Sequence, residues 1–155
     1  MLMNDQNSAL MITVLRNDYP EIARQISEKI NKQLPEQALH NLKFIGQIVA
    51  SFKNEKGITE REWTKGKSMV KIVESRELLT AVVLMFYHRE KILKSSSEKT
   101  RSGVLRELRR QIGVSQEVSS KTAANAIVAF KVYENFRQEV YRLYELIKIE
   151  NQFFK

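Results

Sequence analysis

Helix-breaking residues are scarce in this sequence, and from Val114 to Lys155 there is neither a glycine nor a proline. The whole chain contains only five glycines and two prolines. The residues between them are rich in Glu, Lys, Leu, Gln and Arg, which have high helix propensity. Sustained alternation of apolar and polar residues, which is typical of a half-buried strand, is almost absent. The sequence therefore predicts an all-α fold.

Capping signals and apolar spacing divide the chain into the expected helices. Asp18–Glu21 and Thr59–Glu62 both have the pattern of a capping box, which marks a helix start. The most apolar run, Leu78–Tyr87, predicts a central helix that is buried on all sides. Taken together, these signals predict a single-domain bundle of six or seven helices.

The C-terminal part predicts a long helix over Ser115–Ile149, about 50 Å in length at ~1.5 Å per residue. Its apolar residues recur at alternating spacings of three and four, which is the spacing of a heptad-like seam. Such a helix either kinks, or projects and packs against a second copy of the chain. The candidate oligomer interface, as in a homodimer, consists of Tyr133, Phe136, Val140, Leu143 and Ile147.

Basic residues outnumber acidic ones, 26 Lys and Arg against 18 Asp and Glu, which gives a formal net charge of +8. Residues 1–50 carry five of each sign, so the whole excess lies in later residues. We expect one domain over residues 1–155, with a possible subdivision into neutral helices at 1–57 and a basic part at 58–155. The basic excess favours an acidic partner, either a nucleic acid or an anionic surface.

The segment 105–126, LRELRRQIGVSQEVSSKTAANA, has a distinctive order of residue types. A short amphipathic helix ends at Ile112, Gly113 turns the chain, and Ser115 can cap the next helix. This order resembles the centre of a bacterial helix-turn-helix. The resemblance implies that the helix beginning at Ser115 is presented to a groove of DNA.

Two positions depart from that pattern. Arg109 stands where a helix-turn-helix usually has a small residue, and Ser119 stands where it usually has a β-branched apolar residue. Val118 would take the second place if the register of the helix were shifted by one residue. An ordinary helical hairpin with a glycine C-cap and a serine N-cap is the alternative interpretation.

Residues able to reach phosphates or base edges gather around this turn. The candidate nucleic-acid-binding residues are Arg101, Arg106, Arg109, Arg110, Ser115, Gln116, Ser119, Ser120 and Lys121.

The residues that most enzymes need are scarce. There is no cysteine, and His40, His88, Asp5 and Asp18 are the only histidines and aspartates. No arrangement of them predicts a catalytic triad or a metal site. We therefore expect no enzymatic activity, no catalytic or metal-binding residues, no cofactor and no small-molecule substrate.

The N-terminus lacks the basic start of a signal peptide, and the ten apolar residues of Leu78–Tyr87 are too few to cross a bilayer, which needs about 20. We expect a cytoplasmic protein with no membrane partner. The leading functional hypothesis is a non-enzymatic DNA-binding protein, a regulator of transcription or an accessory factor. The alternative is a helical protein–protein interaction or assembly module that oligomerises through the C-terminal helix.

Overall fold

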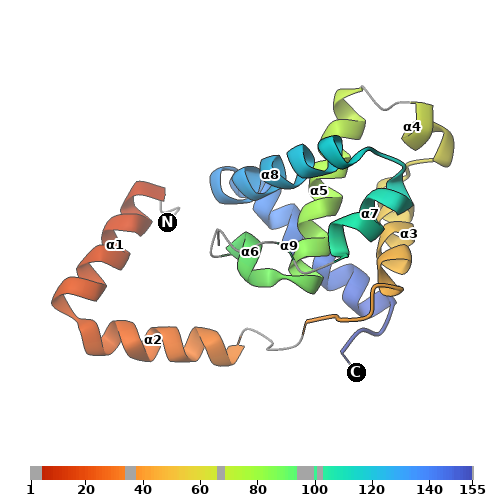
Figure 1. Ribbon diagram of the computed structural model, residues 1–155. Helices are drawn as coiled ribbons and strands as arrows, with labels where there is room; N and C mark the ends of the chain where they lie inside the picture. The colour runs from red at the N-terminus through yellow and green to blue at the C-terminus, as the bar shows by residue number, and fades with distance from the viewer. Residues whose placement is uncertain (1–4, 34–37, 66–68, 94–99, 101–102, 155) are drawn as a thin grey trace. The chain divides into compact units, whose positions relative to one another are not determined.

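The computed structural model describes residues 5–33, 38–65, 69–93, 100 and 103–154. Within these ranges every regular element is an α-helix, and there are nine of them (Figure 1). The all-α prediction is confirmed. The expected number of six or seven helices is too low because two expected helices are each divided, one at His88 and one at Tyr133.

The chain forms two compact units, residues 1–37 and residues 38–155. The possible boundary expected at residue 57 falls inside the second unit. The first unit consists of α1 (Asp5–Asp18) and α2 (Pro20–Gln33), two helices that meet at a sharp bend at Tyr19 (Figure 1); for brevity we call this bent pair the hairpin. None of the side chains that the structure describes in this hairpin is buried.

The second unit contains the remaining helices around one hydrophobic core. They are α3 (Phe44–Lys56), α4 (Glu60–Lys65), α5 (Val70–Tyr87), α6 (Arg89–Leu93), α7 (Val104–Ile112), α8 (Gln116–Val132) and α9 (Glu134–Glu150). Helix α5 lies at the centre and contacts α3, α6, α7, α8 and α9. Every side chain from Leu78 to His88 is buried, which confirms the prediction of a central helix buried on all sides.

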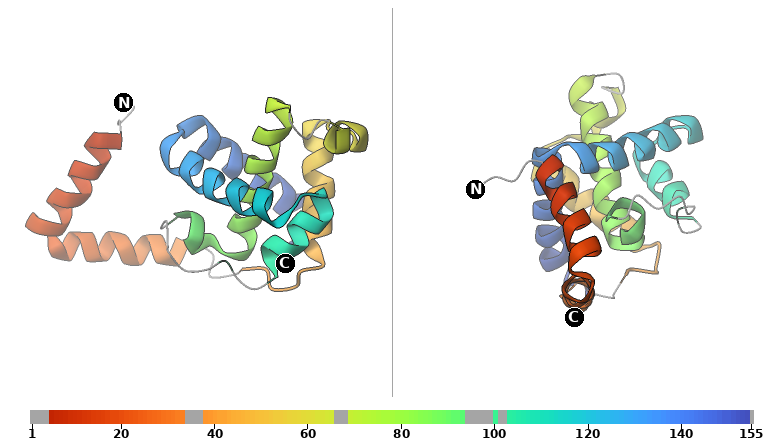
Figure 2. Two further views of the ribbon diagram at one scale, coloured as in Figure 1. Left: turned by 45° about the horizontal axis from the view of Figure 1, so that its top comes forward. Right: turned by 90° about the vertical axis from the view of Figure 1, so that its left-hand side faces the viewer.

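The expected long C-terminal helix is two helices, because the backbone of Tyr133 is extended, with φ −105° and ψ 113°. Helix α9 turns back there, and α8 and α9 pack against each other and against α5 (Figure 2). Arg137 Nη1 donates to the carbonyl oxygens of Phe130, at 3.1 Å, and Lys131, at 3.3 Å. These bonds satisfy carbonyls that the end of α8 leaves without helical partners. The sequence left open whether this helix kinks or projects toward a second copy of the chain, and the structure shows a kink at Tyr133.

This arrangement corrects the candidate oligomer interface. Val140, Leu143 and Ile147 are completely buried in the core of their own unit, and Phe136 is half-buried against it. Only Tyr133, which is 62% exposed, has a side chain free to meet another molecule. The heptad-like spacing therefore serves packing within the second unit.

Across the described ranges, no helix combines the length and the apolar character that crossing a bilayer requires.

Candidate nucleic-acid interface

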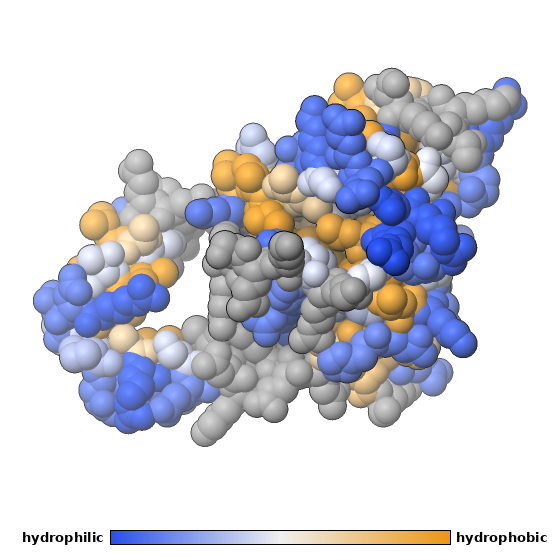
Figure 3. All heavy atoms as spheres, viewed as in Figure 1, coloured by the Kyte–Doolittle hydropathy of each residue, from blue (hydrophilic) through white to orange (hydrophobic). Residues whose placement is uncertain are grey.

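Helix α7 is strongly amphipathic, and its inner side is fixed by the core. Val104, Leu108 and Ile112 are buried, and α7 packs against α3, α5 and α8. Three arginines lie between these buried residues along the sequence of α7. Arg106 and Arg110 are exposed, and Arg109 is half-buried. We call Arg106, Arg109 and Arg110 the α7 arginine face. Figure 3 shows a strongly hydrophilic patch over this helix.

The three arginines differ in how far their charge is already compensated. Arg110 forms a bidentate ion pair with Glu107, in which Nη2 donates to Oε1 at 2.5 Å and Nε donates to Oε2 at 3.0 Å. Hydrogen bonds from Arg110 and from Gln111 lower the pKa of Glu107 to about 2, so Glu107 is ionised at neutral pH. Arg106 and Arg109 form no ion pair with any residue that the structure describes. Their guanidinium groups are therefore available for an external anion.

The turn after α7 has the geometry expected from the sequence. Gly113 has φ 68° and ψ 40°, a left-handed conformation that favours glycine, and its N–H donates to the carbonyl of Arg109 at 2.8 Å. Ser115 is the N-cap of α8, and its Oγ accepts a hydrogen bond from the N–H of Val118 at 3.2 Å. Both caps are made within a few residues, so the local sequence alone determines where α7 ends and α8 begins.

Replacing Ser115 with alanine is expected to lower the free energy of unfolding by about 1 kcal/mol, because the N–H of Val118 loses its acceptor. Urea unfolding followed by circular dichroism measures the loss. The matched control is Ser120→Ala, which changes an exposed serine of the same helix that caps nothing. Equal stability of the two variants would show that the cap contributes nothing.

The start of α8 corrects one candidate residue. Ser119 is 7% exposed and lies on the inner side of the helix with Ala123 and Ala126, so its side chain is not available to DNA. Val118 is 39% exposed, so the register is not shifted. Ser119 thus occupies the buried position where a helix-turn-helix has a β-branched apolar residue, and a smaller, polar side chain fills it.

The other candidates fall into two groups. Ser115, Gln116, Ser120 and Lys121 are exposed in the first turns of α8, directly after the turn that follows the α7 arginine face. Arg101 lies outside the described residues. The structure therefore brings seven of the nine candidates to two consecutive helix segments as exposed or half-buried side chains.

One residue that affects this surface was not among the candidates. Glu117 is exposed in the first turn of α8, between Gln116 and Lys121. A carboxylate there stabilises the helix through its dipole but repels an approaching phosphate. The signal was present in the sequence, since acidic residues are common in the first turn of a helix.

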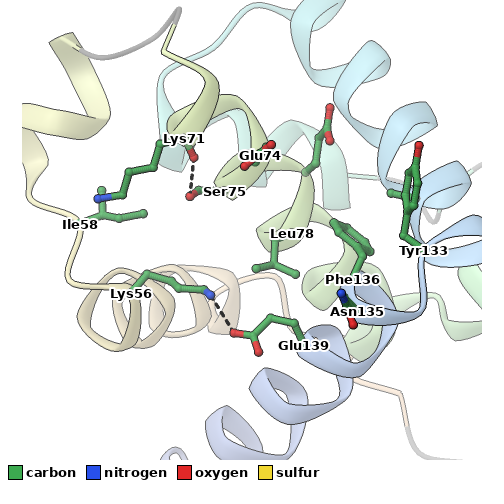
Figure 4. Close-up of a pocket in the computed structure, with 12 residues that line it drawn as sticks. Lys56, Ile58, Lys71, Glu74, Ser75, Leu78, Tyr133, Asn135, Phe136 and Glu139 are labelled. Carbon is green, nitrogen blue, oxygen red and sulfur yellow. Dashed lines mark hydrogen bonds and ion pairs between the residues drawn. The ribbon is translucent and has the colours of Figure 1, made fainter.

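A second feature of the same unit could not be found from the sequence. A cavity of about 620 Å³ is lined by residues of α3, α5, α8 and α9 together with Ile58 and Tyr133. In Figure 4, Lys56 and Glu139 meet across one side of it, with Leu78 and Phe136 nearby. These residues come from distant parts of the chain, so no local pattern in the sequence predicts the cavity.

The polar groups beside the cavity are largely engaged with one another. Glu139 accepts hydrogen bonds from Lys56 at 2.7 Å and from Arg142 at 2.7 and 2.9 Å. Arg142 also donates to Glu55 at 2.9 Å. The hydrogen bonds from Arg142 and then from Lys56 lower the pKa of Glu139 to about 2. This cluster ties α3 to α9.

Because the folded protein lowers the pKa of Glu139 from 4.5 to about 2, its ionisation stabilises the fold above pH 4.5. That contribution is lost as the pH falls from 4.5 toward 2. We expect Glu139→Gln to lower the free energy of unfolding at pH 7 by about 1 kcal/mol, a value reduced for partial exposure, and to flatten this acid-side slope. Urea unfolding between pH 3 and pH 7 measures both. The control is Glu150→Gln, which changes an exposed glutamate near the end of α9. If the stability of Glu139→Gln fell with pH as steeply as that of this control, the acid-side slope could not be attributed to Glu139.

The two histidines differ in their surroundings. His40 is exposed before α3, whereas His88 is buried at the end of α5, its Nε2 lying 3.9 Å from Glu90 Oε2. Over the described part of the chain, no group of three or more His, Asp or Glu side chains is placed to hold a metal ion.

Comparison of the chain with protein-family models, with curated protein sequences and with solved structures finds no match.

Proposed function

We propose that this protein binds DNA, without catalysing a reaction, through α7 and the start of α8. The observation that carries the proposal is the pair of guanidinium groups on Arg106 and Arg109. They have no ion pair within the described ranges, and they lie in the helix that precedes the capped N-terminus of α8. A guanidinium fork matches the geometry of phosphate oxygens, and the positive end of a helix favours the same anion.

The overall charge supports the same partner. Residues 38–155, which form the second unit, contain 22 Lys and Arg against 13 Asp and Glu. Charge of this sign attracts a polyanion over a distance of about 10 Å at moderate salt, before any specific contact forms. The α7 arginine face then supplies the short-range contacts.

The outer side of α8 supports a role in reading DNA. Gln116, Ser120 and Lys121 are exposed there, and side chains of these kinds bond to phosphates or to base edges in the major groove. In this mechanism the arginines hold the DNA backbone while α8 enters the groove. Such a protein acts as a regulator of transcription or as an accessory factor on DNA.

The alternative function, assembly through the C-terminal helix, loses the interface that the sequence predicts. Its interface residues Val140, Leu143 and Ile147 fill the core of the second unit.

The proposal is tested by fluorescence anisotropy with a labelled duplex of random sequence, an RNA hairpin and polyglutamate of equal charge, each titrated at several salt concentrations. We expect the DNA duplex to bind most tightly, with an affinity that falls steeply with salt because counterions are released from the phosphates. Equal affinity for polyglutamate would show that the charge serves an acidic protein. Tighter binding of the RNA would assign the surface to RNA.

A further inference from the structure

The hairpin of α1 and α2 presents large apolar side chains that nothing in their own unit covers. Leu10, Met11, Val14, Tyr19, Ile22 and Ile26 are each between 40% and 63% exposed. An apolar hollow of about 440 Å³ lies against α1. It is lined by Asn7, Leu10, Met11, Val14, Leu15 and Tyr19, and all of these except Asn7 are apolar or aromatic. Figure 3 shows hydrophobic side chains gathered along α1. We call the seven residues Leu10, Met11, Val14, Leu15, Tyr19, Ile22 and Ile26 the hairpin apolar face.

A unit of this size does not hold such a surface in water by itself. Residues 1–37 form the unit, and units below about 40 residues usually need a disulfide, a metal or association with another chain. The chain has no cysteine, and the described residues include no group placed to hold a metal. Each helix has 14 residues, a length at which an isolated helix is only marginally stable. Packing against a further protein surface is the remaining means of stabilisation.

Charge indicates what kind of surface covers the hairpin. Residues 1–37 contain four Lys and Arg against five Asp and Glu, so the unit is nearly neutral. On α2, Arg24 is paired with both Glu21 and Glu28, which leaves little charge to attract a polyanion or an anionic surface. Two copies of this unit can approach without the repulsion that the basic second units would exert on each other.

The exposed area agrees with pairing of two such hairpins. Six large side chains that are each about half exposed offer roughly 500 Å² per copy, or roughly 1,000 Å² for two, which reaches the lower end of specific protein interfaces. Two copies that meet through the same face give each apolar stripe a partner.

We propose that two copies of this chain associate through their hairpin apolar faces, with two-fold symmetry. The same patch serves on both copies, so the interface closes at a dimer. This interface differs from the C-terminal seam expected from the sequence, and it does not depend on whether the second unit binds DNA.

The mass of the full chain in solution, measured by light scattering after size exclusion over a wide concentration range, tests the proposal. We expect a dimer at micromolar concentrations. Val14→Glu combined with Ile26→Glu places charges on the apolar face and is expected to give a monomer. The matched control, Thr13→Glu combined with Gln25→Glu, adds the same charges at the neighbouring positions and is expected to remain a dimer. A monomeric wild type, or a dimer that survives the first pair of substitutions, overturns the proposal.

A second measurement does not rely on disrupting the hairpin. Because the chain has no cysteine, a single introduced cysteine is the only thiol in each copy, and any cross-link between copies must form there. Met11→Cys lies within the proposed interface, and its two copies are expected to be cross-linked readily by a flexible bismaleimide long enough to span that interface. Gln138→Cys, exposed on α9, is expected to remain largely a monomer on a denaturing gel. Equal cross-linking of the two variants would contradict the interface. A chain that dimerises but does not bind DNA would disprove the proposed function alone.

Discussion

Replacing Arg106 and Arg109 with alanine is expected to weaken binding of duplex DNA by roughly 30- to 150-fold, or about 2 to 3 kcal/mol. Each guanidinium is available to a phosphate because no described residue neutralises it. Two lost phosphate contacts should also lower the slope of log affinity against log salt concentration by about 1.8. Anisotropy titrations at four or five salt concentrations give both quantities from one series.

Two further variants separate a local site from a general effect of charge. Arg16→Ala combined with Lys29→Ala removes the same charge from exposed positions of the hairpin, and we expect it to change the affinity only slightly. Glu117→Gln removes the carboxylate at the start of α8 and is expected to strengthen binding severalfold. If the two double variants lost equal affinity, binding would depend on net charge, and the α7 arginine face would not be the site.

The largest loss of stability is expected for Phe86→Ala, about 3 to 5 kcal/mol. Phe86 is completely buried in the C-terminal part of α5. The centroid of its ring lies 4.5 Å from the ring centroid of Tyr144 and 5.4 Å from that of Phe153. Truncation removes the ring contacts that join α5, α9 and the C-terminal residues, and it leaves a cavity between them. A domain of this size has a total stability of about 5 to 15 kcal/mol, so the loss is a large share of it.

Urea unfolding measures this loss, with Val70→Ala as the control. Val70 lies in the same helix as Phe86 but is 73% exposed, so its truncation should cost less than about 0.5 kcal/mol. A small loss for Phe86→Ala would contradict the central position of α5.

The parts of the fold that the sequence predicted correctly are those determined over short distances. Gly113 and Ser115 complete their caps with atoms three or four residues away, so residue type alone locates the turn between α7 and α8. The burial of Leu78–Tyr87 follows in the same way, because a segment apolar on every side has no side to expose.

The divided C-terminal helix could not be predicted, because its cause is tertiary. No glycine or proline marks Tyr133; the chain turns there because α9 packs back onto α5 and α8, and Arg137 satisfies the freed carbonyls. Apolar residues at spacings of three and four suit packing within a chain as well as packing between chains. Spacing alone therefore did not distinguish a core from an oligomer interface at Val140, Leu143 and Ile147.

The candidate interface shows the same limit at the level of single side chains. The helical period leaves Arg106 and Arg110 exposed, whereas Arg109, which the same period would also place outside, is half-buried. Which of them is already paired is a matter of side-chain geometry, as is the burial of Ser119. The covering of the hairpin apolar face involves another molecule, which no pattern within one chain can display.

The most direct measurement of the central claim, that α7 and the start of α8 contact DNA, is an amide chemical-shift titration of the full chain with a short duplex. The largest changes are expected on residues 106–110 of α7 and 115–121 of α8, and they are expected to disappear when Arg106 and Arg109 are replaced by alanine. Changes concentrated on α9 or on the hairpin, with α7 and α8 unaffected, would contradict it.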